Sequence, residues 1–333
     1  MSLLNPSADP SIKAAERETR CAERSSTAKL YMELTKARLS ALVVLTTAVG
    51  FVVAIPVGIN WLLLLYTVIG TSLAAGSAAA INQVLEVARD ARMQRTCRRP
   101  LPSGGITIRH ALTAGIVMGI AGTAMLALLV NLASASLALL TIVLYVFIYT
   151  PMKARSSYNT LVGAVCGAIP PMIGWVAATG ALDAGAWVLG AILFFWQIPH
   201  FFALAWLYRE DYERGGFVML PMLDARGELT ASVIILTSLI LLPLGMLATM
   251  IGLAGWVFLV GSLVLGLWMT ALAVRFYVQR TNPHARGVFF ASLLYLSLLL
   301  CLFMVDRGPV KNGSSWQASA VAAVPTETDR TAP

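Results

Sequence analysis

Long apolar runs alternate with short charged stretches along this chain, and the alternation predicts its architecture. Asp, Glu, Lys and Arg are absent from six segments: 39–85, 110–152, 156–182, 184–208, 229–274 and 287–305. A helix that spans a membrane needs about 20 apolar residues. The runs of 47, 43 and 46 residues therefore hold two helices each, and the runs of 27, 25 and 19 residues hold one each. We expect an all-α, polytopic membrane protein with nine transmembrane helices.

The individual spans follow from turn residues within these runs. The first is expected at about 39–56, and the second runs from Trp61 into the segment around Asn82. The remaining spans are expected at about 109–130, 135–150, 159–179, 185–205, 230–252, 254–276 and 286–305. The fifth of the nine contains Pro170 and Pro171, which remove backbone donors at membrane depth. Two interpretations of this pair stay open, a kink for helix packing and a bend shaped by a substrate.

Polar segments flank the expected membrane domain, which we assign to residues 29–306. Residues 1–28 contain no apolar run, so we expect a disordered arm and not a cleaved signal peptide. An interfacial helix is expected near 30–38, before the first span. Residues 307–333 are rich in Ser, Ala, Thr and Pro, a composition typical of a disordered tail.

Composition and charge agree with a membrane protein and predict its orientation. The chain is 58% hydrophobic and 12% charged, whereas soluble domains carry about 25% charged residues. Of its 24 Lys and Arg residues, 21 fall in 1–38 and in the alternate loops on that side, and the other three lie in the tail. The positive-inside rule then places the N-terminus and the charged loops in the cytoplasm. The net charge of +8 is therefore a topology signal, and we expect no nucleic-acid partner.

The end of the second span holds the first candidate chemistry. Asn82, Glu86 and Asp90 are spaced i, i+4, i+8, and each four-residue step along a helix rises about 6 Å and turns only about 40° further. The three side chains therefore line one face, where stacked carboxylates repel unless a cation lies between them. Mg²⁺ suits one or two carboxylates together with substrate phosphate oxygens. The alternative is ordinary: Glu86 pairs with Arg89, and Asp90 is a solvated helix end.

Cationic and aromatic side chains gather in the loops on the same side. Planar guanidinium groups suit phosphate, and those after the second span are Arg95, Arg98 and Arg99. A second loop holds Tyr149, Lys153 and Arg155, and a third holds Arg209, Glu210 and Asp211, with His200 just inside the membrane. Acids that hold a metal and cations that hold a diphosphate would neutralise a pyrophosphate leaving group from both sides.

These motifs together resemble the UbiA superfamily of intramembrane prenyltransferases. The residues behind the resemblance are N-x-x-x-E-x-x-x-D, R-T-x-R-R-P-L-P and Y-T-P-x-K-x-R. Within the superfamily, five further segments resemble the protohaem IX farnesyltransferases: L-T-K-x-R at 34–38, N-T-x-x-G at 159–163, W-Q-I-P-H-F at 196–201, D-Y-x-x-G-G-x-x-M-L-P at 211–221 and the region 295–306. The resemblance covers roughly Leu30 to Asp306. Ala37 replaces the family's usual Pro, and Glu86 replaces its usual Asp.

The resemblance implies a UbiA-like helix bundle around a central cavity and a defined reaction. A farnesyl group would pass from farnesyl diphosphate to a vinyl carbon of haem b, and water would supply a hydroxyl group, giving haem O. Haem b is then a substrate, Mg²⁺ the cofactor, and a downstream haem A synthase or oxidase assembly factor a possible partner. The setting implied is a bacterial inner membrane, with the active face cytoplasmic.

The resemblance also assigns roles to residues. The metal ligands would be Asn82, Glu86, Asp90, Glu210 and Asp211. Catalysis would depend on Asn82, Glu86, Asp90, Lys153 and Asp211. Substrates would be bound by Arg95, Arg98, Arg99, Tyr149, Arg155, His200 and Arg209. For His200 two interpretations stay open, a helix-end packing residue and a contact to the haem iron or a propionate.

Three other functions remain to be weighed. A related prenyltransferase would use an aromatic or quinone-precursor acceptor, and only the resemblance separates this from haem. A secondary transporter would place acids near the bilayer midplane, whereas these charges gather at one face. An assembly factor without catalysis would leave the clustered acids and arginines unexplained.

Overall fold

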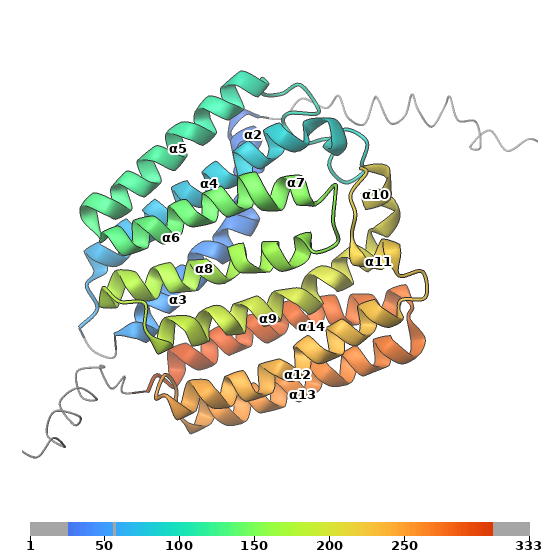
Figure 1. Cartoon of the computed structure of the whole chain (residues 1–333). Helices are drawn as coiled ribbons and strands as arrows, with labels where there is room; N and C mark the ends of the chain where they lie inside the picture. The colour runs from blue at the N-terminus through green and yellow to red at the C-terminus, as the bar shows by residue number, and fades with distance from the viewer. Residues whose placement is uncertain (1–25, 56–57, 309–333) are drawn as a thin grey trace, which may run out of the picture.

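Helices joined by short turns make up the whole structure, a computed structural model that describes residues 26–55 and 58–308 (Figure 1). Within these ranges nine helices are long and apolar enough to cross a membrane, as predicted. The same ranges contain no strand, apart from an isolated bridge between Ala254 and Arg307. The expected arm and tail fall largely outside the described residues.

The spans lie close to their predicted bounds. They are α3 (Ala37–Ala54), α4 (Trp61–Asp90), α5 (Ile108–Leu129), a composite of α6 (Leu132–Val143), η2 (Leu144–Tyr149) and α7 (Thr150–Met152), then α8 (Asn159–Thr179), α9 (Ala184–Leu207), α12 (Glu228–Met250), α13 (Trp256–Gln279) and α14 (Asn282–Val305). Three short helices, α2 (Thr27–Leu34), α10 (Arg209–Arg214) and α11 (Leu220–Leu223), lie between spans or before them.

Capping residues explain where several spans begin. Asn60, Thr107 and Asn131 each accept a hydrogen bond from the backbone N–H three residues later, at 3.0, 3.3 and 2.8 Å. Such caps satisfy donors that the first helical turn leaves unpaired. Helix α8 ends at Gly180, whose φ of 76° is the left-handed conformation that glycine adopts without strain.

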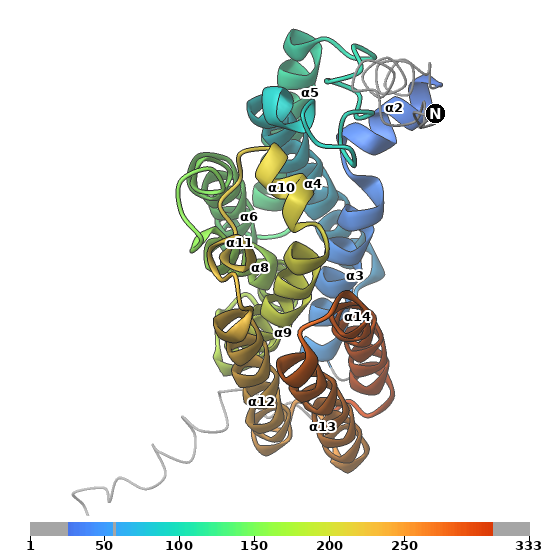
Figure 2. The same ribbon diagram turned by 90° about the vertical axis from the view of Figure 1, so that its right-hand side faces the viewer.

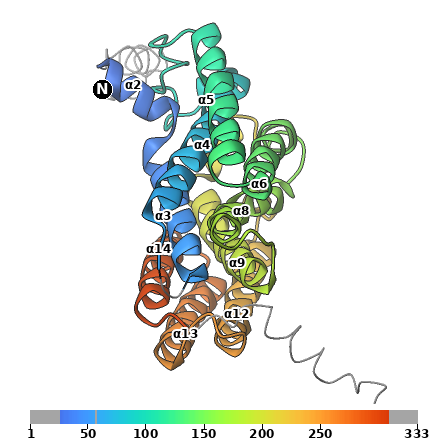
Figure 3. The same ribbon diagram turned by 90° about the vertical axis from the view of Figure 1, so that its left-hand side faces the viewer.

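The helices form an elongated bundle in which sequential neighbours pack together. Helix α4 packs on α5 and α3, α8 lies between α3 and α9, and α12, α13 and α14 complete the other half (Figure 1). At one end, short turns at 130–131, 180–183 and 251–255 join the helices (Figure 3). At the other end lie the longer connections together with α10 and α11 (Figure 2). The charged loops after α4, α7 and α9 therefore share one end of the bundle.

Two local features differ from the predicted regular helices. The span 132–152 changes from α-helix to π-helix at Leu144–Tyr149, where Pro151 removes a backbone donor and the Thr150 N–H bonds Tyr145 O instead. Helix α2, at the place of the predicted interfacial helix, ends at Leu34, earlier than predicted, because the chain turns sharply at Lys36.

The proline pair lies within a continuous helix that packs tightly on α3. A Cβ atom added at Gly50 would lie 2.2 Å from Pro171 O, and one added at Gly174 would lie 1.9 Å from Thr47 O. The two backbones therefore touch at Pro171 itself and again at Gly174, three residues further along α8. Pro170 also lines the central cavity, so the structure gives the pair both a packing role and a cavity-lining position.

Candidate active site

The face of α4 that carries Asn82, Glu86 and Asp90 points into the protein. The exposed fractions of these residues are 0%, 2% and 1%, so the interpretation of Asp90 as a solvated helix end is wrong. Lys153, and not Arg89, pairs with Glu86, with 2.9 Å between Nζ and Oε1. Each of the three side chains meets one cation from another part of the chain.

Asp90 pairs with Arg99, whose Nη1 lies 2.6 Å from Asp90 Oδ2. The turns at 91–99 bring the two residues together, and Thr96 Oγ1 supports them by donating to Asp90 O at 2.9 Å. Asp90 is the last residue of α4, and its backbone oxygen, a helix-end carbonyl without a partner in the regular helix, also accepts from the Met93 N–H at 3.3 Å.

Lys36 is the third cation, and the break between α2 and α3 positions it. Its backbone is left-handed, with φ 49° and ψ 47°, and its Nζ donates to Asn82 Oδ1 at 2.7 Å. Burial lowers the pKa of the Lys36 ammonium to about 7, and the nearby charges of Arg99 and Lys153 add to this effect. Lys36 therefore changes charge near neutral pH.

Lys153 keeps its charge more firmly. Burial works to lower the pKa of Lys153, but the charge and hydrogen bond of Glu86, together with the nearby Tyr145 and Tyr212, outweigh that effect and raise the pKa above the ordinary lysine value. The ammonium also lies 4.5 Å from the centre of the Tyr149 ring, within cation–π distance. Val218 N–H donates to Lys153 O at 2.7 Å, so the loop after α10 holds this turn in place.

These groups line one end of a cavity of about 380 Å³. The cavity extends from the charged cluster between α3, α4, α8 and α9, where its walls are mostly apolar and small. Wall residues at the inner part include Val43, Ala75, Ala79, Gly167 and Pro170. This cavity suits a ligand with a polar head, at the charged end, and an apolar tail, in the inner part.

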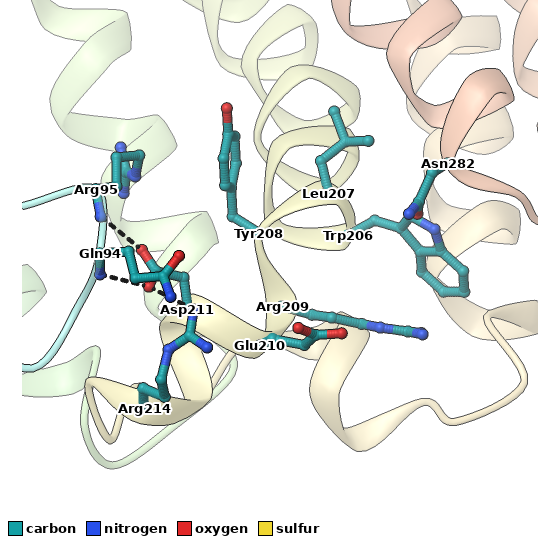
Figure 4. Close-up of a pocket in the computed structure, with 10 residues that line it drawn as sticks. All are labelled: Gln94, Arg95, Trp206, Leu207, Tyr208, Arg209, Glu210, Asp211, Arg214 and Asn282. Atoms are coloured by element: carbon teal, nitrogen blue, oxygen red, sulfur yellow. Dashed lines mark hydrogen bonds and ion pairs between the residues drawn. The ribbon is translucent and has the colours of Figure 1, made fainter. Parts of the chain in front are cut away.

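Asp211 connects the loops after α4 and α9. Its carboxylate accepts from the backbone N–H of Gln94 at 2.7 Å and of Arg95 at 3.2 Å, and it pairs with Arg214 at 2.9 Å (Figure 4). Burial acts to raise the pKa of Asp211, but the hydrogen bonds from Arg214, Gln94 and Arg95 together lower it below the usual value. Its bonds to Gln94 and Arg95 hold the loop after α4, and its ion pair with Arg214 lies within α10.

A second, more polar hollow of about 450 Å³ lies beside that loop. Figure 4 shows Arg95 and Arg209 on opposite sides of it. Arg95 lies 5.4 Å from the ring centres of both Tyr208 and Tyr212, and Arg209 lies 5.1 Å from that of Trp206. Among the described residues neither guanidinium forms an ion pair with an acid. Arg95 also lines the central cavity, so it connects the two spaces.

Comparison with known proteins places this geometry in a family. The model of the UbiA prenyltransferase family matches residues 43–299. A Solibacter usitatus protein named Protoheme IX farnesyltransferase is 44% identical over 286 residues, which cover 83% of this chain and 98% of the relative. The chain belongs to the UbiA prenyltransferase family. It is therefore a prenyltransferase, as the motifs predicted.

Solved structures confirm the UbiA fold for this family member. A digeranylgeranylglyceryl phosphate synthase superposes with a TM-score of 0.72 at 15% identity, over 84% of this chain and 97% of the other. A UbiA homologue from Archaeoglobus fulgidus, bound to GPP and Mg²⁺, superposes with a TM-score of 0.59 at 16% identity, over 83% and 99% of the two chains. At these identities the likeness shows the fold.

The predicted site residues of this UbiA member divide by position. Those that line the central cavity are Glu86, Asp90, Arg95, Arg99, Tyr149, Lys153 and His200. Arg209, Glu210 and Asp211 line the polar hollow instead, and Glu210 is exposed there. Arg98 and Arg155 are exposed and line neither space. Asn82 lies just behind the cavity wall, where it bonds Lys36 and Thr150.

Sequence reasoning gave no role to Lys36 or Gln197, which both line the cavity. A signal existed for each, because both belong to segments that carried the family resemblance, L-T-K-x-R and W-Q-I-P-H-F. The sequence did not reveal the left-handed turn at Lys36. This turn brings the Lys36 side chain into contact with Asn82, 46 residues further along the chain.

Proposed function

We propose that this protein transfers the farnesyl group of farnesyl diphosphate to a vinyl carbon of haem b, giving haem O. The observation that supports this most directly is the cavity, which joins a buried cationic and carboxylate cluster to an apolar interior. A diphosphate ester of an apolar chain is divided in the same way, into a charged head and an apolar tail. Relatives named Protoheme IX farnesyltransferase, at 44% identity over nearly their full length, support haem b as the acceptor.

The residues on α4 fit a hard divalent cation. The donors that face the cavity are the carboxylate oxygens of Glu86 and Asp90, the class that Mg²⁺ prefers. Lys153 Nζ lies 2.9 Å from Glu86 Oε1 and 3.3 Å from Oε2, so one ammonium group contacts both oxygens of this buried carboxylate. No group of three or more His, Cys, Asp or Glu side chains suited to a metal occurs in the described residues. Substrate phosphate oxygens would therefore complete the coordination of Mg²⁺ held by Glu86 and Asp90.

The cations of the site act on the leaving group. When bound, Mg²⁺ would stabilise the negative charge that develops on the departing diphosphate. Lys36, Lys153 and Arg99 lie next to the carboxylates and would hold the remaining phosphate oxygens. Tyr149 presents its ring face beside Lys153, where it would shield the allylic cation from bulk water.

The acceptor would approach from the polar hollow. Haem b carries two propionate groups, and the guanidinium groups of Arg95 and Arg209, which form no ion pair among the described residues, suit carboxylates. Arg95 borders both spaces, so a haem held there by its propionates would place its ring edge toward the cavity. The predicted roles of Arg98 and Arg155 would require them to move, because they line neither space, and Glu210 lines the polar hollow, apart from Glu86 and Asp90 in the central cavity.

The charge distribution supports a cytoplasmic active face in a bacterial inner membrane. All three loops that form the site belong to the side rich in Lys and Arg. A product handed directly to a haem A synthase or an oxidase assembly factor would leave from this side, and that partnership stays a prediction.

One reaction tests the proposal. The purified protein is incubated with haem b, farnesyl diphosphate and Mg²⁺, and haem O is sought by mass spectrometry. A parallel reaction replaces haem b with 4-hydroxybenzoate, the acceptor class of the alternative. Formation of haem O alone supports the proposal, and prenylation of hydroxybenzoate alone overturns it.

A further inference from the structure

An amide and an imidazole from successive turns of α9 line the inner part of the central cavity. Gln197 is 6% exposed, and its Nε2 donates to Leu193 O at 2.9 Å and to Ala164 O at 3.4 Å. Both of its donor hydrogens are therefore used, and Oε1 is left as an acceptor. This oxygen lies against α8, because a Cβ atom added at Gly167 would be only 1.9 Å from it. A buried amide within a membrane span is costly unless it serves a purpose.

The hydrogen bonds of Ser292 determine the tautomer of His200. Ser292 Oγ donates its only proton to Phe289 O at 2.6 Å, and His200 Nδ1 lies 2.8 Å from the same Oγ. Nδ1 must then be the donor, so the proton of a neutral ring resides there and Nε2 carries a lone pair. Among the described residues no hydrogen-bond partner is found for Nε2. Stacking on Trp196 and Phe289, with centroids 5.4 and 4.8 Å away, holds the ring in place.

Two acceptors thus line the same cavity one helical turn apart, with no donor beside them on α9. Nearby wall residues such as Cys166, Phe201 and Leu204 offer no strong acceptor. A molecule with two O–H donors, namely water, fits this pair of acceptors. The proposed reaction requires one water molecule at the vinyl carbon next to the porphyrin ring. It also requires that water be excluded from the farnesyl cation.

We propose that Gln197 Oε1 and His200 Nε2 bind the water that hydroxylates the haem, with His200 as the catalytic base. This inference rests on the proposed function. The C–O bond of farnesyl diphosphate breaks, the terminal vinyl carbon bonds the farnesyl carbon, and a cation remains on the carbon next to the porphyrin ring. The water oxygen then bonds that carbon while one of its protons passes to His200 Nε2. No oxidant or reductant is needed.

A misplaced water would change the product and not only the rate. The same cation can lose a proton from the neighbouring CH₂ group, which gives an alkene lighter than haem O by one water molecule. Positioned base catalysis contributes about 10²–10⁴-fold to a proton transfer. Loss of either acceptor should therefore raise the alkene-to-alcohol ratio by about 10²-fold.

Two variants and a matched control test the inference by product mass. Gln197→Leu removes the amide oxygen, and His200→Phe keeps the stacked ring but removes both nitrogens. The control is Gln83→Leu, because Gln83 also donates from Nε2 to two backbone oxygens, at 2.8 and 2.9 Å, but does not line the cavity. The product ratio is independent of how much of each variant folds.

The outcomes separate the possibilities. Alkene as the main product of both variants, with haem O unchanged in the control, supports the inference. Variants that form only haem O, however slowly, overturn it. A Soret band of bound haem b that shifts in His200→Phe but not in Gln197→Leu would make His200 an iron ligand, which also overturns it. Absence of any farnesylated haem from the wild-type protein would instead refute the proposed function.

Discussion

The buried pair of Glu86 and Lys153 allows structural and catalytic roles to be separated. Their charged atoms lie 2.9 Å apart, with side-chain exposures of 2% and 11%. At that distance two charges attract by about 6 kcal/mol for an effective dielectric constant of about 20, before the cost of desolvation. Removing one partner from a buried pair costs about 3–5 kcal/mol, whereas replacing both is often nearly neutral.

We therefore expect Glu86→Gln and Lys153→Met each to lower the free energy of unfolding by about 3–5 kcal/mol. The double variant should lose no more than about 2 kcal/mol, because it leaves no unpaired buried charge. All three should lose farnesyl transfer, since each removes a group that holds metal or diphosphate. Equilibrium unfolding in mixed micelles measures the first effect, and haem O formation measures the second.

The double-mutant cycle refutes this reasoning if the two single effects simply add. Additivity would mean that Glu86 and Lys153 do not interact in the folded protein. A stable double variant that still forms haem O at the wild-type rate would instead remove both residues from the chemistry. A stable and inactive double variant is the expected result.

Three further variants test the neighbouring residues. Asp90→Ala should lower haem farnesylation by at least about 10²-fold while the protein still inserts, and near-normal turnover would remove the metal role. Burial holds the pKa of Lys36 at about 7, so between pH 7 and the unfolded value of about 10.4 the unfolded state binds more protons and stability rises with pH. Lys36→Met should flatten that rise in thermal unfolding measured across this range. Asp211→Asn should cost about 1–3 kcal/mol by weakening the bonds to Gln94 and Arg95. Because the pKa of Asp211 is lowered in the folded state, its contribution is full above about pH 3.9 and disappears as the pH falls through the folded value.

The spans were predictable because bilayer thickness sets their length. The charge-free run 39–85 divides into α3 and α4 at the turn residues before Trp61, as the sequence indicated. The π-helical turn at Leu144–Tyr149 was not predictable, because it arises from a balance between Pro151 and the hydroxyl of Thr150, which donates to Tyr145 O at 2.7 Å. Small differences in local hydrogen bonding determine such a turn.

The site was predictable where a regular helix determines the direction in which side chains point. Spacing alone placed Asn82, Glu86 and Asp90 on one face, and that face is buried. In the turns beyond α4 no period relates one residue to the next, and so Arg99 reaches the cavity while its neighbour Arg98 is exposed. The partner of each acid depends on contacts between distant segments, which the sequence of one chain does not reveal.

The pairing of each acid with a cation has a consequence for substrate binding. Lys153 and Arg99 balance the charges of Glu86 and Asp90, so the carboxylates stay paired and the cluster has a net positive charge only when Lys36 is protonated. A bound diphosphate that pairs with Lys153 and Arg99 would leave the buried carboxylates of Glu86 and Asp90 without a counter-charge. Binding would then cost free energy unless a divalent cation binds these carboxylates.

Diphosphate and Mg²⁺ should therefore bind cooperatively, and by linkage each raises the affinity of the other by the same factor. We expect a factor of about 10–10², measured by calorimetry with an unreactive farnesyl thiodiphosphate titrated with and without Mg²⁺. The protein-free affinity of Mg²⁺ for the analogue is subtracted as a control. Glu86→Gln should reduce the factor toward one, because it removes a carboxylate that the diphosphate would otherwise leave unpaired. Equal affinities of the wild-type protein in both titrations would show that these acids do not bind the metal.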